Sequence, residues 1–311
     1  MSQTTLRTKG DFPGTVTFNR PMGRAYYRMG IAFSGEGARI MAAMKPGQFV
    51  EIDLTHVPLP PEDTIPEHLR DAAIRQLILR RPFSLCDVRT VKDKTLIDII
   101  YAAIGPATLR MTMFKPGDVT RVIGPLGNGF WISPDKTTAL LVAGGVGAPP
   151  IQHLAVTLAQ QQTYERLVLF TGSRTAQDVP FEWYQDNNKI LFWELAPYSI
   201  DIHIATDDGS YGYNGLVTDC LRQWLKQYAD IPTSQLILYG CGPEPMLAAM
   251  ARIALDTGIE GQVSLERRMA CGFNVCQGCG VEFKSPDGND TYFRMCCHHG
   301  PVFDAEYVVF E

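Results

Sequence analysis

"LLVAGGVGAPPI", residues 140–151, places Gly144, Gly145 and Gly147 between an apolar run and a segment that begins with two prolines. The apolar run predicts a buried strand, and proline is common at a helix start, so the stretch predicts a strand, a tight turn and a helix. Glycine lets a ligand approach the backbone, and the free N–H groups of the helix start favour an anion. The sequence therefore predicts a nucleotide-binding turn, although a strand-to-helix turn without a ligand would show the same pattern. The full G-x-G-x-x-G fingerprint is absent.

The rest of this region alternates apolar runs with helical segments. The runs are "TTALLVAG", "RLVLFTG", "ILFWEL", "IHIATD" and "QLILYGCG"; the helical segments are "PPIQHLAVTLAQQQ", "GLVTDCLRQWLKQYA" and "EPMLAAMARIALDTG". Such alternation is typical of a parallel sheet covered on both faces. We therefore expect an α/β doubly wound nucleotide-binding domain over residues 134–261.

A second glycine turn occurs in "LYGCGPEPM", residues 238–246, where Cys241, Gly242 and Pro243 follow an apolar strand. Ligands of parallel sheets bind at the carboxyl ends of the strands, so this turn and the first one are expected at the same edge. Cys241 could lie beside a nicotinamide ring or have a purely structural role.

Residues 1–133 contain short apolar runs separated by Gly and Pro turns, which predict an antiparallel barrel or sandwich. Residues 55–80 interrupt this pattern with a Pro-rich loop and a short helix, and we interpret them as an insertion of open role. In "RRPFSLCD", residues 80–87, Arg81 could bind a phosphate, Phe83 could lie against a flat ring and Ser84 could donate a hydroxyl. Taken alone, this motif could equally be a turn with a surface arginine.

Five of the eight cysteines lie after residue 270. Cys271, Cys276 and Cys279 have the C-x4-C-x2-C spacing of plant-type [2Fe–2S] sites, and Cys296–Cys297 could supply the fourth thiolate. Structural zinc on four cysteines is the alternative, although zinc sites favour paired C-x2-C motifs. Because residues 262–311 are too few to bury much apolar surface, we expect the cysteines to hold this small domain together. Its last residues, "AEYVVFE", are compatible with a strand.

The composition and charge of the sequence limit the binding partners and the cellular location that we expect. The formal net charge is −5 and no Lys/Arg cluster is present, so nucleic acid is not an expected partner. The first residues lack the apolar core of a secretory signal, and no apolar run approaches the about 18 residues of a membrane-spanning helix. A cytoplasmic location is expected, where thiols stay reduced and clustered cysteines bind metal.

The order of these motifs resembles one family, and the likeness covers nearly the whole chain. The matching stretches are "KPGQFV", "RRPFSL", "KPGDVTRVIGPLGNGF", "LLVAGGVGAPPI", "TDDGSYGYNGLVTD", "LYGCGPEPM", "SLERRMACGFNVCQGC" and "CHHGPVF". The sequence resembles the electron-transfer subunits of NAD-dependent dihydroorotate dehydrogenases, which belong to the ferredoxin-NADP reductase superfamily. The resemblance implies a multidomain protein with a six-stranded antiparallel β-barrel FAD domain, the nucleotide-binding domain and a small C-terminal [2Fe–2S] domain.

The resemblance also assigns residues. The flavin contacts fall on Arg81, Pro82, Phe83, Ser84, Ile100, Tyr101, Ala102, Ala107 and Thr108, and the cluster ligands on Cys271, Cys276, Cys279 and Cys297. One departure is "GPAT", residues 105–108, where the family has Gly-x-Gly-Thr. If the turn has positive φ there, the Cβ of Ala107 is expected to strain it.

The implied function is electron transfer without a dihydroorotate site in this chain. An FMN-containing catalytic subunit, as a heterotetramer with two copies of each chain, would deliver electrons that pass through the [2Fe–2S] cluster and FAD to NAD⁺ in pyrimidine biosynthesis. The alternatives are a diaphorase subunit of another redox complex, of hydrogenase, sulfide reductase or transhydrogenase type, and a zinc-stabilised nucleotide-binding protein without redox activity. Ser173 and Arg174 could meet the 2′-phosphate of NADP, whereas the resemblance favours NAD.

Overall fold

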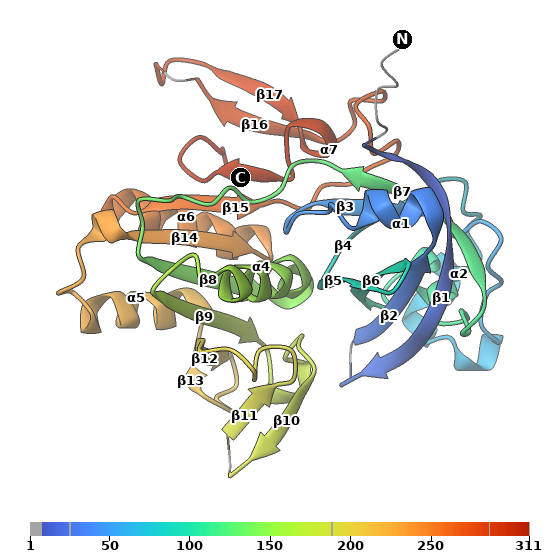
Figure 1. The fold of residues 1–311 in the computed structure, drawn as a ribbon, viewed down its shortest axis with the longest axis horizontal. Coiled ribbons are helices and arrows are strands. Elements are labelled where there is room, and N and C mark those ends of the chain that lie inside the picture. Colours follow the sequence, from blue (N-terminus) through green and yellow to red (C-terminus); the bar gives the residue numbers. More distant parts are fainter. Residues whose placement is uncertain (1–7, 25, 188, 286, 311) are drawn as a thin grey trace.

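The computed structural model describes residues 8–24, 26–187, 189–285 and 287–310. Figure 1 shows an antiparallel sheet in blue and cyan on one side, a second sheet in green and orange on the other, and the C-terminal segment in red along the top. The predicted site residues lie in these two sheets, in the turns and helices that connect their strands, and in the C-terminal segment.

The first sheet is antiparallel, with strand order β4-β3-β7-β1-β2-β6-β5. Only Leu85 and Cys86 separate β4 from β5, which lie at opposite ends of this order, so the sheet curls round on itself. The expected antiparallel domain is present, but it has seven strands where the resemblance implies six, because one extended run is divided into β4 and β5. The strands are β1 (Gly10–Met22), β2 (Tyr26–Phe33), β3 (Phe49–Ile52), β4 (Arg81–Ser84), β5 (Asp87–Val91), β6 (Lys94–Ala102) and β7 (Val119–Leu126).

Two helices, α1 (Gly35–Met41) and α3 (Pro106–Met111), accompany this sheet, and residues 55–80 add a third, α2 (Arg70–Ala73). Before α2 come two short 3-10 helices, η1 (Glu62–Thr64) and η2 (Glu67–Leu69), so the Pro-rich loop and short helix that the sequence predicts are both present. Buried apolar side chains fasten this segment to α3, namely Ile65, Leu69, Ala73 and Leu109.

The second sheet has strand order β13-β12-β9-β8-β14-β15-β18, and all its pairs are parallel except β15 with β18. Helix α4 (Ala148–Gln161) covers one face, and α5 (Val217–Gln227) and α6 (Glu244–Thr257) cover the other, each over its own apolar core. These three helices match the three predicted helical segments. The strands are β8 (Thr138–Gly144), β9 (Arg166–Ser173), β12 (Asp201–Thr206), β13 (Tyr213–Asn214), β14 (Leu236–Cys241), β15 (Glu260–Ser264) and β18 (Val302–Asp304).

The run "ILFWEL" does not join this sheet. It forms most of β11 (Lys189–Phe192), which pairs with β10 (Trp183–Asp186) in a separate antiparallel hairpin. The physical reason is the short connection, because a parallel crossover needs a dozen or more residues whereas an antiparallel hairpin needs only a tight turn. The prediction of a sheet strand at this place is therefore wrong.

The C-terminal segment shares its core with the parallel sheet. It contains β16 (Gly280–Lys284), β17 (Thr291–Met295) and α7 (Cys296–His299), and its β18 extends the second sheet. Side chains of this segment pack in the same apolar core as α5 and α6, including Cys279, Val281, Phe283, Cys296 and Phe303. Cysteines are thus not its only support. The sequence is compatible with a strand at residues 305–311, but strand β18 ends at Asp304, before that stretch. Within residues 305–310, Val308 forms an isolated β-bridge with Phe283.

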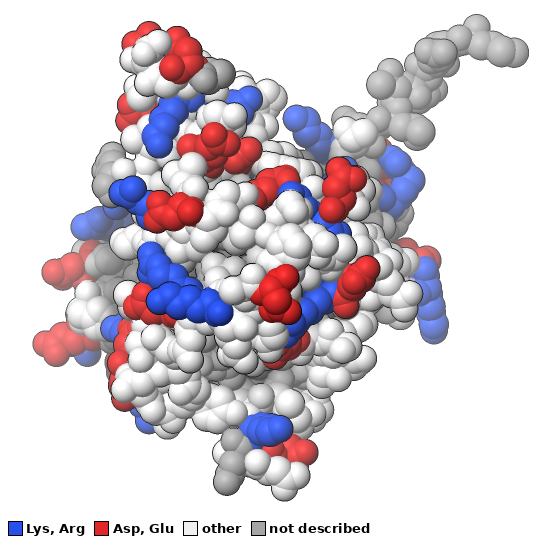
Figure 2. All heavy atoms as spheres, turned by 90° about the vertical axis from the view of Figure 1, so that its left-hand side faces the viewer, with Lys and Arg blue, Asp and Glu red and all other residues white. Residues whose placement is uncertain are grey.

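The surface carries both signs of charge. Figure 2 shows Lys and Arg side chains interspersed with Asp and Glu over the face of the second sheet's domain. Within the described residues, no helix combines the length and the apolar character needed to cross a membrane.

Candidate functional site

Two adjoining cavities form a cleft between the two sheets. Their volumes are about 730 Å³ and about 200 Å³, and the lining of each includes residues of β4, of the turn at the end of β14 and of the segment leading to the cysteine loop. The shared lining residues are Pro82, Phe83, Ile104, Thr108, Gly242, Leu265, Glu266, Arg267 and Met269. Cofactor pockets commonly have volumes of about 300–1,000 Å³, so the larger cavity falls in that range and the smaller one does so only as part of the cleft.

Strand β4 supplies the predicted flavin tetrapeptide to this cleft. Pro82 and Phe83 line both cavities, Arg81 lines the larger and Ser84 the smaller. The Arg81 guanidinium donates through Nη1 to the carbonyl oxygens of Leu79 at 2.9 Å and Arg80 at 3.0 Å. The structure thus brings the four residues together and fixes one nitrogen of Arg81 on the chain that leads into β4.

The end of β6 and the start of α3 form the neighbouring wall. Ile100, Tyr101 and Ala102 line the smaller cavity, and the Tyr101 hydroxyl donates to Asn19 Oδ1 at 3.0 Å. Burial raises the pKa of Tyr101, so this phenol is neutral.

Ala107 and Thr108 lie in α3 and line the larger cavity. The backbone of Ala107 is helical rather than of positive φ, so its Cβ does not strain the turn and the expected strain is absent. Thr108 Oγ1 accepts hydrogen bonds from the backbone N–H groups of Ile104 at 3.0 Å and Gly105 at 3.1 Å.

The two glycine turns touch one another. A Cβ built on Gly147 would lie 2.2 Å from the carbonyl oxygen of Cys241, so only glycine allows the start of α4 to approach the end of β14. Gly147, Cys241 and Gly242 line the smaller cavity and Pro243 the larger, whereas Gly144 and Gly145 do not line either cavity. Gly145 has φ of +51°, which explains its identity. The sequence prediction that both turns meet at one sheet edge is confirmed.

Cys241 is enclosed at this edge. Burial raises the pKa of its thiol to about 12, so the thiol is neutral where it lines the smaller cavity. The other two isolated cysteines, Cys86 and Cys220, are buried in the interior.

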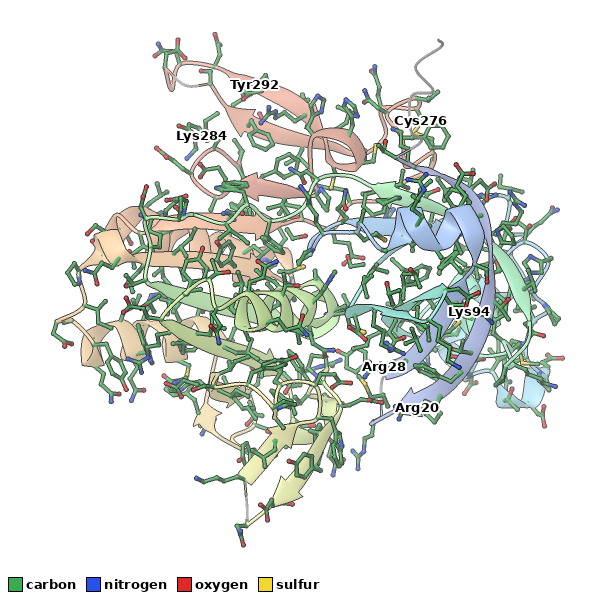
Figure 3. All side chains as sticks on the ribbon, in the orientation of Figure 1. Arg20, Arg28, Lys94, Cys276, Lys284 and Tyr292 are labelled. Carbon is green, nitrogen blue, oxygen red and sulfur yellow. The ribbon has the colours of Figure 1, made fainter. Side chains whose placement is uncertain are left out.

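The cysteine loop directs backbone N–H groups at sulfur atoms. The N–H groups of Val275 and Cys276 lie 3.3 and 3.4 Å from Cys271 Sγ, and that of Asn274 lies 3.2 Å from Cys297 Sγ. Gly272, Asn274 and Gln277 have positive φ, which allows this tight winding. Figure 3 shows Cys276 on the loop at the top of the molecule, where it is solvent-exposed.

The four thiols fall into two neighbouring pairs. Cys271 contacts Cys276, and Cys297 contacts Cys279, whose Sγ accepts a hydrogen bond from the Cys297 N–H at 3.4 Å. Within the described residues, no three His, Cys, Asp or Glu side chains are grouped as a single metal ion would need. Two thiol pairs with N–H groups aimed at sulfur fit a two-iron centre held by four thiolates.

Cys296 has a different environment from Cys297. Its side chain is fully buried in the apolar core, and its Sγ donates to the carbonyl oxygen of Leu265 at 3.4 Å. Burial raises the pKa of the Cys296 thiol far above its ordinary value, and it raises that of Cys297 to about 12. At Cys271 burial also opposes ionisation, but N–H groups including that of Cys276 prevail and lower its pKa to about 7. Thus Cys297, rather than Cys296, directs its sulfur to the loop.

The two histidines that follow Cys297 contact their own neighbours in the chain. His299 Nδ1 accepts a hydrogen bond from the N–H of Met295 at 3.0 Å, and His298 packs edge-on against it. Ser173 is the last residue of β9 and Arg174 follows it, and Ser173 Oγ donates to the carbonyl oxygen of Thr175 at 2.8 Å.

Sequence reasoning missed a buried ionic cluster that joins the first sheet to the β10–β11 hairpin. Arg28 pairs with Asp98 and with Glu182 at 2.7 Å each, and with Glu194, while Arg89 pairs with Asp98 at 3.0 Å. Arg28 is 6% exposed, and Figure 3 places it where the blue strands meet the yellow hairpin. Its partners follow it by up to 166 residues, so no local pattern could reveal the cluster.

Glu51 is a second buried acid that the sequence analysis did not single out. It lies on β3 with 1% exposure, and its Oε1 has no hydrogen-bond partner among the described residues. A Cβ on Gly272 would lie 2.4 Å from this oxygen, so the cysteine loop packs directly on Glu51. Burial raises the pKa of Glu51, and the nearby Arg80 and Arg81 oppose that shift.

Comparison with known proteins identifies the chain's relatives. Residues 266–309 match the model of the iron-sulfur cluster binding domain of dihydroorotate dehydrogenase B, and residues 141–252 match that of the oxidoreductase NAD-binding domain. The dihydroorotate dehydrogenase B (NAD(+)) electron transfer subunit of Geobacillus kaustophilus is 33% identical over 95% of this chain and 97% of its own length. The corresponding subunit of Fusobacterium nucleatum is 32% identical over 96% and 98%.

Solved structures show the same fold. The NADH-dependent reduced ferredoxin-NADP oxidoreductase superposes with a TM-score of 0.70 at 23% identity, over 100% of this chain and 92% of that chain. A ferredoxin NADP⁺ reductase from Neisseria gonorrhoeae with bound FAD and NADP gives a TM-score of 0.57 at 15% identity, over 80% and 92%. From its near-complete match to these curated relatives, the chain belongs to the family of electron transfer subunits of NAD-dependent dihydroorotate dehydrogenase B.

Proposed function

We propose that this chain carries electrons from a partner FMN dehydrogenase, which oxidises dihydroorotate, through a [2Fe–2S] cluster and FAD to NAD⁺. The observation that carries the proposal is the cleft, because its lining joins β4, the ends of the parallel strands and the segment that leads to the cysteine loop. Residues expected to bind the flavin and the nicotinamide thus line one cleft, and the segment that lines it leads to the cysteine loop.

The residues that would hold each group follow from this arrangement. FAD would be held by the β4 tetrapeptide and the β6–α3 wall, NAD by the two glycine turns, and the cluster by four thiolates. The flavin set is Arg81, Pro82, Phe83, Ser84, Ile100, Tyr101, Ala102, Ala107 and Thr108; the NAD set is Gly144, Gly145, Gly147, Cys241, Gly242 and Pro243; the cluster set is Cys271, Cys276, Cys279 and Cys297.

A bound flavin supplies the exchange between the two-electron chemistry of a nicotinamide and the one-electron chemistry of an iron–sulfur cluster. The protein's own contribution is binding and orientation. Gly147 lets the two turns close on the smaller cavity, Phe83 gives that cavity an aromatic wall, and Arg81 presents a cation to the larger cavity. The thiol of Cys241 is neutral at this place, so it offers packing rather than charge.

The division into units is also part of the proposal. We propose an FAD-binding domain at residues 1–133 with the insertion at 55–80, an NAD-binding α/β doubly wound domain at 134–261 and a cluster domain at 262–311. Strand β15 continues to Ser264, so the last boundary is best drawn just after that strand. The proposed assembly is cytoplasmic and contains two copies of this chain and two of the FMN-containing catalytic subunit.

Co-expression with that catalytic subunit tests the proposal. The purified complex is expected to reduce NAD⁺ when dihydroorotate is added. A Cys276→Ser complex should lose this coupled reaction and keep NADH-dependent reduction of an artificial dye, because only the cluster is removed. A wild-type complex that oxidises dihydroorotate with a dye but never reduces NAD⁺ contradicts the proposed function.

A further inference from the structure

The insertion at residues 55–80 ends at the mouth of the flavin cleft. Its residue Leu79 lines the larger cavity together with Ile104, which lies in the connection between β6 and α3. Leu79 is 40% exposed and Ile104 is 72% exposed. Two large aliphatic side chains at one cavity mouth provide an apolar surface that a flat ring would cover favourably, at about 25 cal/mol per Å² of apolar area buried.

Contacts before and after Leu79 fix the insertion at the opening of the larger cavity. Its buried apolar side chains pack on Leu109 of α3, and Arg110 Nη1 donates to the carbonyl oxygen of Ala73 at 3.2 Å. Leu77 is buried in the core of the first sheet, and Arg81 Nη1 bonds the carbonyl oxygen of Leu79. Leu79 is therefore fixed by neighbours on both sides of it, while its own side chain faces the cavity.

A flavin dinucleotide would extend over both cavities, with a different part of the molecule in each. The smaller cavity, of about 200 Å³, contains the glycine turns where a nicotinamide would meet the reactive ring. The larger cavity, of about 730 Å³, has Arg81, Arg267 and Arg268 in its lining, which suit phosphate groups. Arg267 is already paired with Glu244 through two contacts, at 2.9 and 3.1 Å, so Arg81 and Arg268 are the cations available there.

We propose that the insertion is an FAD-specificity element, in which Leu79 together with Ile104 binds the adenine ring of FAD in the larger cavity. This inference rests on the proposed function, since it assumes that the cleft holds a flavin. FMN lacks the adenosine half and would occupy only the inner part of the cleft. Leu79 lines only the larger cavity, so it should set the preference for FAD over FMN and leave the binding of the ring system unchanged, whereas Ile104 lines both cavities.

The test compares FAD and FMN binding to flavin-depleted protein that retains its cluster, by quenching of flavin fluorescence. The variants are Leu79→Ser, Ile104→Ser and the double variant. The matched control is Ile78→Ser, because Ile78 is 76% exposed on the same segment but does not line the cavity. We expect the dissociation constant for FAD to rise about tenfold in the double variant, which is the effect of about 1.4 kcal/mol. In Leu79→Ser the constant for FMN should change less than twofold, and the control should match wild type.

Unchanged FAD affinity in the double variant overturns the inference, and so does an equal loss for FAD and FMN in Leu79→Ser. A raised KM for NADH with unchanged FAD affinity also overturns it, because the larger cavity would then serve the nicotinamide nucleotide. These results are distinct from failure of the proposed function, in which wild-type protein binds neither flavin. Retained FMN binding shows that each variant is folded.

Discussion

At the residue scale, the adjacent cysteines Cys296 and Cys297 have different roles, because Cys297 belongs to the expected cluster site and Cys296 to the apolar core. Cys297→Ser should remove most of the iron and sulfide and bleach the visible absorption of the cluster, because its sulfur faces the cysteine loop. Cys296→Ser should retain the iron, since that thiol bonds Leu265 inside the core. Iron and sulfide analysis of anaerobically purified protein checks this, and iron loss only in Cys296→Ser would reverse the assignment.

Because of His153, the folding stability of the nucleotide-binding domain should depend on pH in the acidic range. Burial in α4 lowers the pKa of His153 to about 4, against about 6.5 in an unfolded chain. The unfolded state therefore binds the proton first, and stability is lost as pH falls through this window. Between pH 7 and pH 5 the expected loss from this residue is about 2 kcal/mol.

His153→Gln should remove that part of the pH dependence. Urea unfolding of wild type and variant at both pH values measures it, with the free energy of unfolding of the variant falling less on acidification. An equal fall in both proteins would show that His153 is not the group that titrates.

Some single residues of the site were predictable from the sequence and others were not. The spacing of Cys271, Cys276 and Cys279 is local, and so the loop was predictable, but spacing could not distinguish Cys296 from Cys297. Arg28 lies in "AYYRMGIAF", where nothing nearby indicates a buried cation. Its partners come from other strands and from the hairpin, and only the folded chain brings them together.

At the scale of elements, the β10–β11 hairpin depends on the Arg28 cluster for its attachment. Arg28→Met should destabilise the protein by about 3 kcal/mol, because Glu194 loses its cation at a buried place, while Asp98 keeps only Arg89 and Glu182 keeps only Arg20. Arg28→Lys keeps the charge but cannot contact all three carboxylates at once, so it should lose less. Thermal unfolding gives the ranking, and an Arg28→Met variant within about 1 kcal/mol of wild type would contradict it.

The contact between the two glycine turns gives a second prediction at this scale. Gly147→Ala should push the start of α4 away from Cys241, costing about 1–3 kcal/mol and raising the KM for NADH. Gly105→Ala is the control, because a Cβ there would meet nothing within 4 Å. Steady-state kinetics with a dye acceptor measure the effect, and equal KM values in both variants would refute a role for this close approach.

Periodic elements were predictable from sequence and context-dependent ones were not. Helices α4, α5 and α6 have sequence patterns long enough to be recognised without their neighbours. The run "ILFWEL" has the same apolar character as a sheet strand, and only its tight link to β10 determines that it forms a hairpin. Likewise, the C-terminal segment gains a core by packing on α5 and α6, which its own composition could not reveal.

At the scale of the whole molecule, the arrangement explains why one chain combines three kinds of site. The cleft lies between the two sheets, and the segment that lines it, residues 265–269, leads directly into the cysteine loop. The sequence order of the motifs was sufficient to predict the three parts. Their convergence on one cleft is a property of the folded chain.

We expect NADH and the cluster to exchange electrons only through a flavin held by this chain. Anaerobic reduction by NADH, followed by the electron paramagnetic resonance signal of the reduced cluster, tests it in wild-type protein and in flavin-free Arg81→Ala. We predict a signal in wild type and none in Arg81→Ala, whose cluster dithionite should still reduce. An equal signal from NADH in the flavin-free variant would contradict the account.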